Sequence, residues 1–169
     1  PLEEAPAEYA ACVELLAPYA DYLALNISSP NTADLRRMHE PDRLRALLEA
    51  VIARKGRKPL FLKISPDLGP AELEAVARLA VESGTGLIAV NTTVDRAGLP
   101  GLEAGGLSGK PLKERALSTL SALRTLTEGK VPLIGVGGIF GAGDARERLR
   151  AGASLVQVYT GFIYRGPKI

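Results

Sequence analysis

The segment PLIGVGG (Pro132–Gly138) decides the fold class, because it joins a short apolar run to a pair of glycines. The run Pro132–Val136 is almost continuously apolar, which is typical of a strand that is buried on both faces. Four other runs share this character, and we expect each to be a strand: Tyr22–Leu25, Leu60–Ile64, Gly86–Val90 and Leu155–Tyr159.

Helical segments separate these runs, and prolines and glycines mark their ends. Pro41 precedes the segment Asp42–Arg54, and Pro70 precedes Ala71–Ser83, which Gly84 follows. Proline is common in the first turn of a helix and glycine just after the last. The other expected helices are Glu8–Tyr19, Lys113–Thr127 and Ala142–Ala151. The alternation of helices and strands predicts a parallel sheet with right-handed crossovers.

Two α/β architectures accept this order, an open doubly wound sheet and part of a (β/α)8 barrel. Length favours the open sheet, because a complete barrel takes ~250 residues and the chain has 169. The strand ends favour the barrel, because polar or glycine-rich residues follow all five runs, whereas an open sheet concentrates binding residues at one switch point. We therefore predict an α/β TIM barrel of which the chain supplies roughly the last five strands, without the first three strands and the final helix.

Composition excludes several classes of protein. Hydrophobic residues make up 46% of the chain and charged residues 24%, as in a globular domain. The net charge of +2 leaves no basic surplus for nucleic acid. Cys12, expected to pack in a helix, and His39, expected at the surface, offer no metal site. No apolar run reaches the ~20 residues that cross a membrane. The chain starts at Pro1 without an initiator Met or a signal peptide, so we expect it not to begin where its gene does.

Amide side chains follow the expected strands. Asn26, Asn31 and Asn91 are the only asparagines, and each comes just after an apolar run. An amide offers both a donor and an acceptor, so three converging amides suit a ring that carries alternating N–H and C=O groups. Each asparagine taken singly is equally compatible with a turn or a cap.

A lysine and two glycine-containing strand ends suggest sites for negative charge. Lys63 ends an apolar run, so its ammonium would lie among buried groups beside a ring that becomes negative, unless it reaches solvent. Gly137–Gly138 and Tyr159–Gly161 follow the last two runs, where many barrels hold a phosphate. A tight turn is the alternative explanation for the glycine pair.

Ser29 lies in a loop that Pro30 stiffens. No His or Asp stands near it in the sequence, and His39 belongs to a separate charged stretch. To act as a base, Ser29 would need a water relay or a substrate proton made acidic by a neighbouring carbonyl. The residues alone equally allow a loop cap.

Six segments in one order resemble dihydroorotate dehydrogenase: NISSPNT (26–32), KISPDL (63–68), NTT (91–93), GGLSGKPL (105–112), IGVGGI (134–139) and AGASLVQVYTGF (151–162). The resemblance implies a flavin-dependent barrel that uses FMN to oxidise dihydroorotate to orotate in pyrimidine biosynthesis. Residues 1–169 would be the C-terminal part of a single flavin-binding TIM-barrel domain.

The resemblance also assigns residues. Ser29 stands where class 2, quinone-using members carry the catalytic base and class 1 members carry cysteine. The implied substrate-binding residues are Asn26, Asn31, Asn91 and Thr92. The implied FMN-binding residues are Asn26, Lys63, Val90, Gly109, Gly137, Gly138, Tyr159 and Thr160. Val90 departs from the family pattern, because many members carry Thr there, and a side-chain contact with the flavin would be lost. No metal is implied.

The partners implied by the resemblance are dihydroorotate or orotate, and a quinone that is reached through an N-terminal region absent from the chain. The whole protein would associate peripherally with a membrane on its cytoplasmic side, with no anchor in this chain. Three alternatives stay open: a class 1-like FMN dehydrogenase with a soluble acceptor, a phosphate-binding barrel isomerase or synthase, and a non-catalytic half-barrel. Ser29 and the segment Tyr159–Lys168 weigh against the first, and the lack of Asp or Glu at the strand ends weighs against the second. We expect exposed strand edges in an isolated chain, which leaves its ligand binding and activity open.

Overall fold

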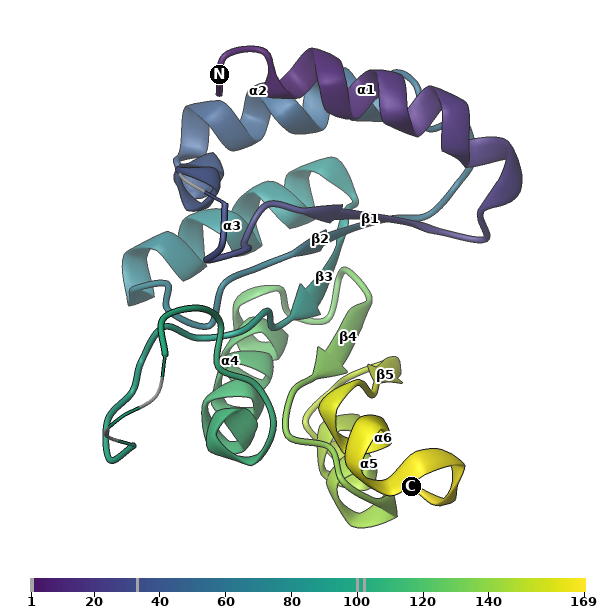
Figure 1. Ribbon diagram of the computed structural model, residues 1–169. Helices are drawn as coiled ribbons and strands as arrows, with labels where there is room; N and C mark the ends of the chain where they lie inside the picture. The colour runs from purple at the N-terminus through teal and green to yellow at the C-terminus, as the bar shows by residue number, and fades with distance from the viewer. Residues whose placement is uncertain (1, 33, 100, 102) are drawn as a thin grey trace.

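Five parallel strands form one sheet in the computed structural model, which describes residues 2–32, 34–99, 101 and 103–169 (Figure 1). The strands are β1 (Leu23–Asn26), β2 (Leu60–Lys63), β3 (Gly86–Ala89), β4 (Leu133–Val136) and β5 (Leu155–Gln157). They neighbour one another in sequence order. A doubly wound sheet would reverse its order at a switch point, so the sequential order confirms the predicted partial barrel. In the register, Asn26 pairs with Lys63, and Lys63 pairs with Ile88.

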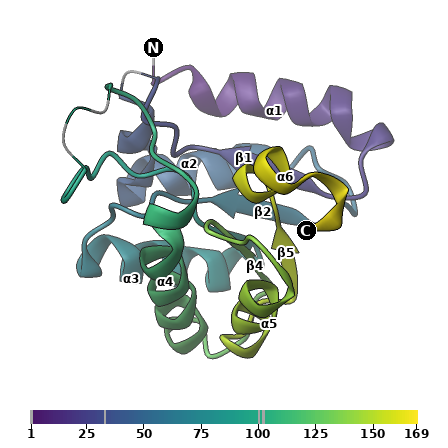
Figure 2. The ribbon, with the colours of Figure 1, turned by 60° about the horizontal axis from the view of Figure 1, so that its bottom comes forward.

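The helices pack side by side around the sheet, each touching the next from α1 to α5. They are α1 (Ala5–Leu16), α2 (Pro41–Ile52), α3 (Pro70–Ser83), α4 (Lys113–Leu126), α5 (Ala142–Arg150) and α6 (Thr160–Arg165). Short 3₁₀ helices cover Ala17–Tyr19, Leu35–His39, Lys110–Leu112 and Gly166–Lys168. Figure 2 shows α2 to α5 along one side of the sheet and α6 on the other. The five expected helices are therefore present, with shifted ends.

Local chemistry fixes the helix ends where the sequence indicated them. Pro41 and Pro70 are the first residues of α2 and α3. The Glu72 carboxylate accepts a hydrogen bond from the Gly69 N–H at 2.7 Å, which caps α3 at its start. Gly84 ends α3 at φ +65°, a conformation that side chains rarely adopt.

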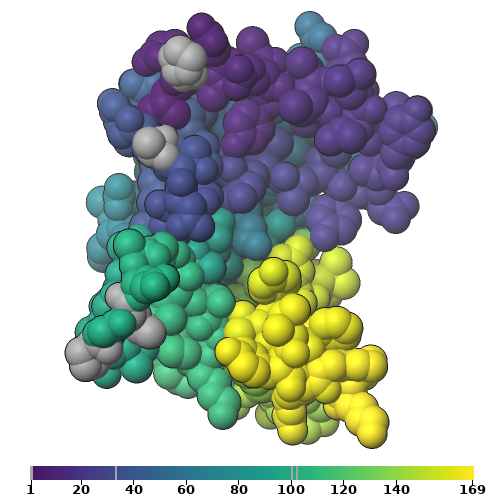
Figure 3. Space-filling view, in the orientation of Figure 1, coloured from purple at the N-terminus to yellow at the C-terminus, as the bar shows by residue number. Residues whose placement is uncertain are grey.

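The main core lies between the sheet and the helices. Leu25, Leu62 and Leu87 from the sheet are buried there with Leu47 and Leu120 from the helices. Burial of these apolar side chains stabilises the packing of the helices on the sheet, and this packing fixes the strand ends relative to one another. Figure 3 shows the molecule from outside, with the N-terminal part at one end and the C-terminal part at the other.

The prediction that all five strands are buried on both faces is wrong for β1 and β5. All residues of β3 and β4 are buried, whereas β1 alternates between buried and exposed residues. Leu155 at the start of β5 is 54% exposed. Both strands are edges of the sheet, so their inner side chains lack the neighbours that cover those of β3 and β4.

Two single-residue expectations are also wrong. Cys12 is exposed, because α1 turns Ala10 and Val13 inward instead. His39 is only 3% exposed, and its Nδ1 lies 2.7 Å from the Arg36 carbonyl oxygen. The expected strand end at Tyr159 is replaced by the start of α6, because β5 ends at Gln157.

Candidate active site

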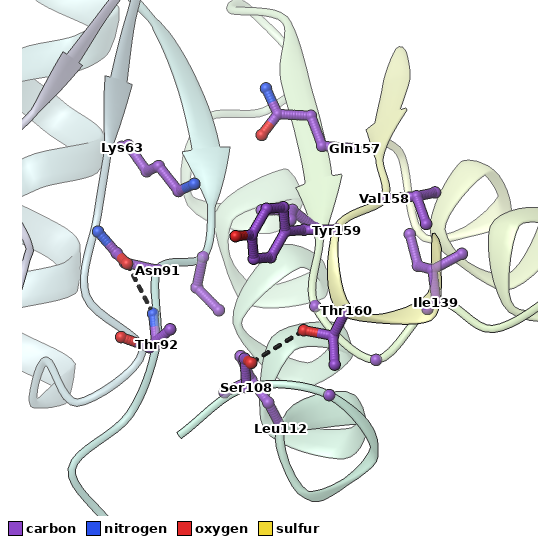
Figure 4. A pocket seen from close by; sticks show the side chains of 16 residues that line it. Lys63, Asn91, Thr92, Ser108, Leu112, Ile139, Gln157, Val158, Tyr159 and Thr160 are labelled. Carbon is purple, nitrogen blue, oxygen red and sulfur yellow. Dashed lines mark hydrogen bonds between the residues drawn. The ribbon is translucent and has the colours of Figure 1, made fainter. Parts of the chain in front are cut away.

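A cavity of about 300 Å³ lies at the carboxyl ends of β2 to β5 (Figure 4). Nine residues predicted from the sequence line it: Lys63, Val90, Asn91, Thr92, Gly109, Gly137, Gly138, Tyr159 and Thr160. The lining residues that sequence reasoning missed are Ser108, Leu112, Val136, Ile139, Gln157 and Val158, while Gly161 belongs to the expected anion-binding strand end Tyr159–Gly161. The predicted residues Asn26, Ser29 and Asn31 lie outside this lining, in β1 and the loop after it.

Lys63, the last residue of β2, points its ammonium group into the cavity (Figure 4). Its side chain is partly buried, and it has no hydrogen bond or ion pair to any of the residues that the structure describes. Burial lowers the pKa of Lys63. A partly buried cation without an anion is costly, so the site suits a ligand that carries or develops negative charge.

Asn26 and Asn91 meet across three neighbouring strand ends. The Asn91 amide donates to Asn26 Oδ1 and to Ser28 Oγ, each at 2.9 Å. The Ser28 hydroxyl in turn donates to the Lys63 carbonyl at 2.6 Å. The Thr92 N–H donates to Asn91 Oδ1 at 2.8 Å, which fixes the orientation of that amide. The predicted convergence therefore holds for these two asparagines.

Ser29 and Asn31 share the loop after β1. Ser29 Oγ accepts a hydrogen bond from the Asn31 N–H at 3.3 Å. In the described part of the chain no His or carboxylate is bonded to this hydroxyl. A Cβ atom at Gly105 would lie 3.6 Å from Asn31 Oδ1, and one at Gly106 would clash with Thr92 Oγ1. The segment around Gly105–Gly106 therefore lies against Asn31 and Thr92, two of the four predicted substrate-binding residues.

The glycine turn after β4 packs on the start of α4. Gly137 and Gly138 have φ values of +110° and +68°. A Cβ atom at Gly138 would lie only 2.5 Å from Lys113 Cα. The turn conformation and this close packing each require glycine, so a phosphate is not needed to explain the pair. Beside the turn, the hydroxyls of Ser108 and Thr160 are 2.9 Å apart.

Arg148 of α5 donates a hydrogen bond to the backbone of this turn, and it was not predicted from the sequence. Its side chain is fully buried, and its Nη2 donates to the carbonyls of Gly137 and Lys113, each at 2.8 Å. Burial lowers the pKa of this guanidinium. Arg148 stands among the exposed arginines of the segment ARERLR (145–150), so no sequence pattern distinguishes it.

The described residues form neither a metal site nor a membrane-spanning helix. No group of three His, Cys, Asp or Glu side chains there could hold a metal ion. No helix in the same part of the chain has the length and apolar character to span a membrane.

Comparison with known families gives this site a context. A family model described as "Dihydroorotate dehydrogenase" matches residues 3–169. The chain belongs to the dihydroorotate dehydrogenase family. The resemblance carried by the six sequence segments is thereby confirmed at the level of the family.

Relatives in the dihydroorotate dehydrogenase family are similar over the whole chain. The protein named dihydroorotate dehydrogenase (quinone) from Prochlorococcus marinus is 50% identical, covering 100% of this chain and 46% of that protein. The protein of the same name from Erythrobacter litoralis is 52% identical, covering 95% and 49%. The crystal structure of the Eimeria tenella enzyme in complex with ferulenol has a TM-score of 0.91 and 37% identity, covering 96% and 50%. The chain thus spans about half the length of these relatives.

Proposed function

We propose that residues 1–169 are the C-terminal part of a single flavin-binding (β/α)8 barrel domain that oxidises dihydroorotate to orotate in pyrimidine biosynthesis. The observation that carries the proposal is the Lys63 ammonium, which has no acidic partner among the described residues and is directed into a cavity next to the Asn26–Asn91 pair. Family membership supports this activity, and the names of the relatives support a quinone as electron acceptor. The whole protein would meet quinone and membrane, on the cytoplasmic side, through a region outside this chain.

The cavity fits FMN as a cofactor. Lys63 has no acidic partner among the described residues, so its positive charge is available to the electron-rich ring of a reduced flavin. We propose that Lys63 and Val90 of the cavity lining hold the ring, together with Asn26, which lies outside the lining but is bonded to Asn91. The phosphate end would be held by Gly109, Gly137, Gly138, Tyr159 and Thr160. The Val90 N–H already donates to the Val136 carbonyl at 3.3 Å. Val90 can therefore offer a flavin only its carbonyl group and its apolar surface.

The asparagines and Thr92 suit the pyrimidine substrate. Asn26, Asn31, Asn91 and Thr92 present amide and hydroxyl groups that match the N–H and C=O groups on the ring of dihydroorotate. Because Asn91 is bonded to Asn26 and to the Thr92 N–H, these groups are oriented before a ligand arrives. Such preorganisation supplies much of the rate of a two-reactant step.

Ser29 is the proposed catalytic base. Its Oγ would take the proton from the carbon next to a ring carbonyl, which makes that proton acidic, while the hydroxyl's own proton would pass to a water relay. Bound FMN would supply the acceptor for the hydride from the neighbouring carbon. The Lys63 ammonium places positive charge where negative charge develops, which lowers the barrier.

The alternative functions are less well supported. A phosphate-binding isomerase or synthase usually needs carboxylates at its strand ends, and no Asp or Glu lines the cavity among the described residues. A class 1-like dehydrogenase with a soluble acceptor would carry cysteine in place of Ser29, and the relatives carry the quinone name. A non-catalytic half-barrel would give no reason for a partly buried Lys63 that pairs with none of the residues in the described ranges.

Variants of Ser29 test the proposal. Ser29→Ala should slow anaerobic flavin reduction by dihydroorotate about 10² to 10⁴-fold, the usual contribution of a positioned base. The affinity for orotate should change little, because the hydroxyl mainly serves the proton transfer. Ser121→Ala on the exposed face of α4 is the matched control and should reduce at the wild-type rate. Normal reduction kinetics in Ser29→Ala would show that the base is elsewhere.

A further inference from the structure

The Asp67 carboxylate, next to the loops that carry the proposed substrate-binding residues, accepts several hydrogen bonds. Asp67, in the loop after β2, has a side chain that is 16% exposed. It accepts hydrogen bonds from Arg36 Nη1 at 2.9 Å, Arg115 Nη1 at 2.7 Å and the Val94 N–H at 3.0 Å, and from the Thr93 hydroxyl. The carboxylate therefore joins segments that follow β1, β2 and β3, together with α4.

Arg36 makes the bonds that reach the proposed substrate residues. While its Nη1 pairs with Asp67, its Nη2 donates to the Thr92 carbonyl at 3.1 Å and its Nε to the Ser28 carbonyl at 3.4 Å. Ser28 directly precedes Ser29, and Thr92 directly follows Asn91. One rigid guanidinium fork thus holds the loop of the proposed base against the strand end of the proposed substrate site.

Arg115 provides an internal comparison. Its guanidinium binds the same Asp67 carboxylate and also Asp95, both at 2.7 Å. Its hydrogen bonds in the described structure go to Asp67, Thr93 and Asp95, and none goes to Ser28 or Thr92. Arg115 and Arg36 each pair with Asp67. Of these two arginines, only Arg36 also donates to the Ser28 and Thr92 carbonyls and so joins the two loops.

We propose that Arg36 is a positioning residue that sets Ser29 relative to Asn91 and Thr92, with Asp67 orienting its guanidinium. The inference rests on the proposed function, because it gives Arg36 a role through the proposed base and substrate residues. The Ser28 carbonyl belongs to the peptide group that leads into Ser29, so its orientation sets where the Ser29 hydroxyl lies. Displacement of a reacting group by about 1 Å can cost about 10²-fold in rate.

Flavin reduction in matched variants gives the first test. We expect Arg36→Gln to slow reduction by dihydroorotate about 10 to 10²-fold, with the flavin absorption spectrum unchanged. Arg36→Lys keeps the charge beside Asp67 but lacks the fork, so it should recover only part of the rate. Arg115→Gln should stay within about threefold of wild type, since surface ion pairs contribute little. Equal rates in Arg36→Gln and Arg115→Gln would overturn the proposal.

Hydrogen–deuterium exchange of the chain without ligands gives a second test that needs no activity. Arg36→Gln should speed amide exchange in residues 26–32, whereas Arg115→Gln should leave exchange in residues 26–32 unchanged, because its hydrogen bonds go to Asp67, Thr93 and Asp95. Wild-type exchange in residues 26–32 of Arg36→Gln would refute the positioning role. If Arg36→Gln does not fold, Arg36→Lys serves in its place. Absent flavin reduction in the wild type would contradict the proposed function alone, because the exchange experiment still decides the role of Arg36.

Discussion

The Lys63 ammonium is held partly buried without an acidic partner among the described residues, at a cost to folding. Because burial lowers the pKa of Lys63, the charged form is disfavoured in the folded state, and stability rises as pH climbs from the folded pKa toward the ordinary value. We predict that Lys63→Met stabilises the ligand-free protein at pH 7 by up to about 1 kcal/mol and weakens flavin binding. Thermal unfolding and flavin titration measure the two effects. A variant that is less stable and binds flavin normally would contradict this assignment.

Ionisation of Asp67, which pairs with Arg36 and Arg115, should make the stability of the protein depend on pH. Burial alone would raise the pKa of Asp67, but hydrogen bonds from Thr93, Val94 and Arg36 outweigh it and lower the pKa. This stabilisation is complete above the unfolded value of about 3.9 and is lost as pH falls through the lower folded pKa. Urea unfolding should therefore show Asp67→Asn less stable than wild type at pH 6, with a gap that narrows below about pH 4. A gap that is constant with pH would rule out this ionisation as the cause.

A site residue could be predicted from the sequence only where its residue type is unusual in its sequence context. An asparagine or lysine at the end of an apolar run is unusual, so Asn26, Lys63 and Asn91 could be assigned to a site from the sequence. Arg36 and Arg148 could not, because they lie in charged stretches that resemble solvated helix faces. Their roles depend on backbone carbonyls that are distant in sequence, and residue patterns do not contain those contacts.

The glycine turn between β4 and α5 is an element that we expect to tolerate substitution poorly. Gly138 combines φ +68° with a Cβ position 2.5 Å from the Lys113 backbone. Gly138→Ala should therefore destabilise the protein by about 1 to 3 kcal/mol. Gly143→Ala in α5 is the matched control, because nothing lies within 4 Å of its Cβ position. It should stabilise by about 0.5 to 1 kcal/mol. Urea unfolding of both variants tests this, and equal effects would contradict the packing argument.

Element boundaries were predictable where the chain marks them chemically. Pro41, Pro70 and Gly84 mark helix ends, and the structure places those ends there. The segment after Gln157 has no such marker, because Val158 and Tyr159 continue the apolar run of β5 while the chain turns into α6. A short apolar run does not by itself distinguish a strand from the first turn of a short helix.

Both ends of the sheet leave apolar side chains exposed. Leu15, Leu16 and Tyr19 precede β1 in the chain, Phe162 and Ile163 lie in α6 after β5, and all five are exposed. Unpaired strand edges with exposed apolar groups favour association. We predict that the isolated chain self-associates as its concentration rises, so that light scattering reports an increasing average mass. A constant monomer mass across the concentration range would show that the two edges are protected.

The arrangement of the whole molecule followed from the order of its segments. Alternating helices and strands, with polar or glycine-rich residues after every strand, predicted a sequential parallel sheet, and the structure has one. Exposure at the two edge strands was not predictable from their composition, because it depends on which strands have neighbours on both sides. The candidate site at the carboxyl ends of the strands is a consequence of this arrangement.

We propose that these strand ends bind a flavin and that the flavin takes electrons from dihydroorotate. The anaerobic visible absorption spectrum of the purified protein, recorded before and after addition of dihydroorotate, tests both steps at once. We expect an oxidised flavin spectrum that bleaches when dihydroorotate is added. A protein without a flavin spectrum, or one whose spectrum dihydroorotate leaves unchanged, would contradict it.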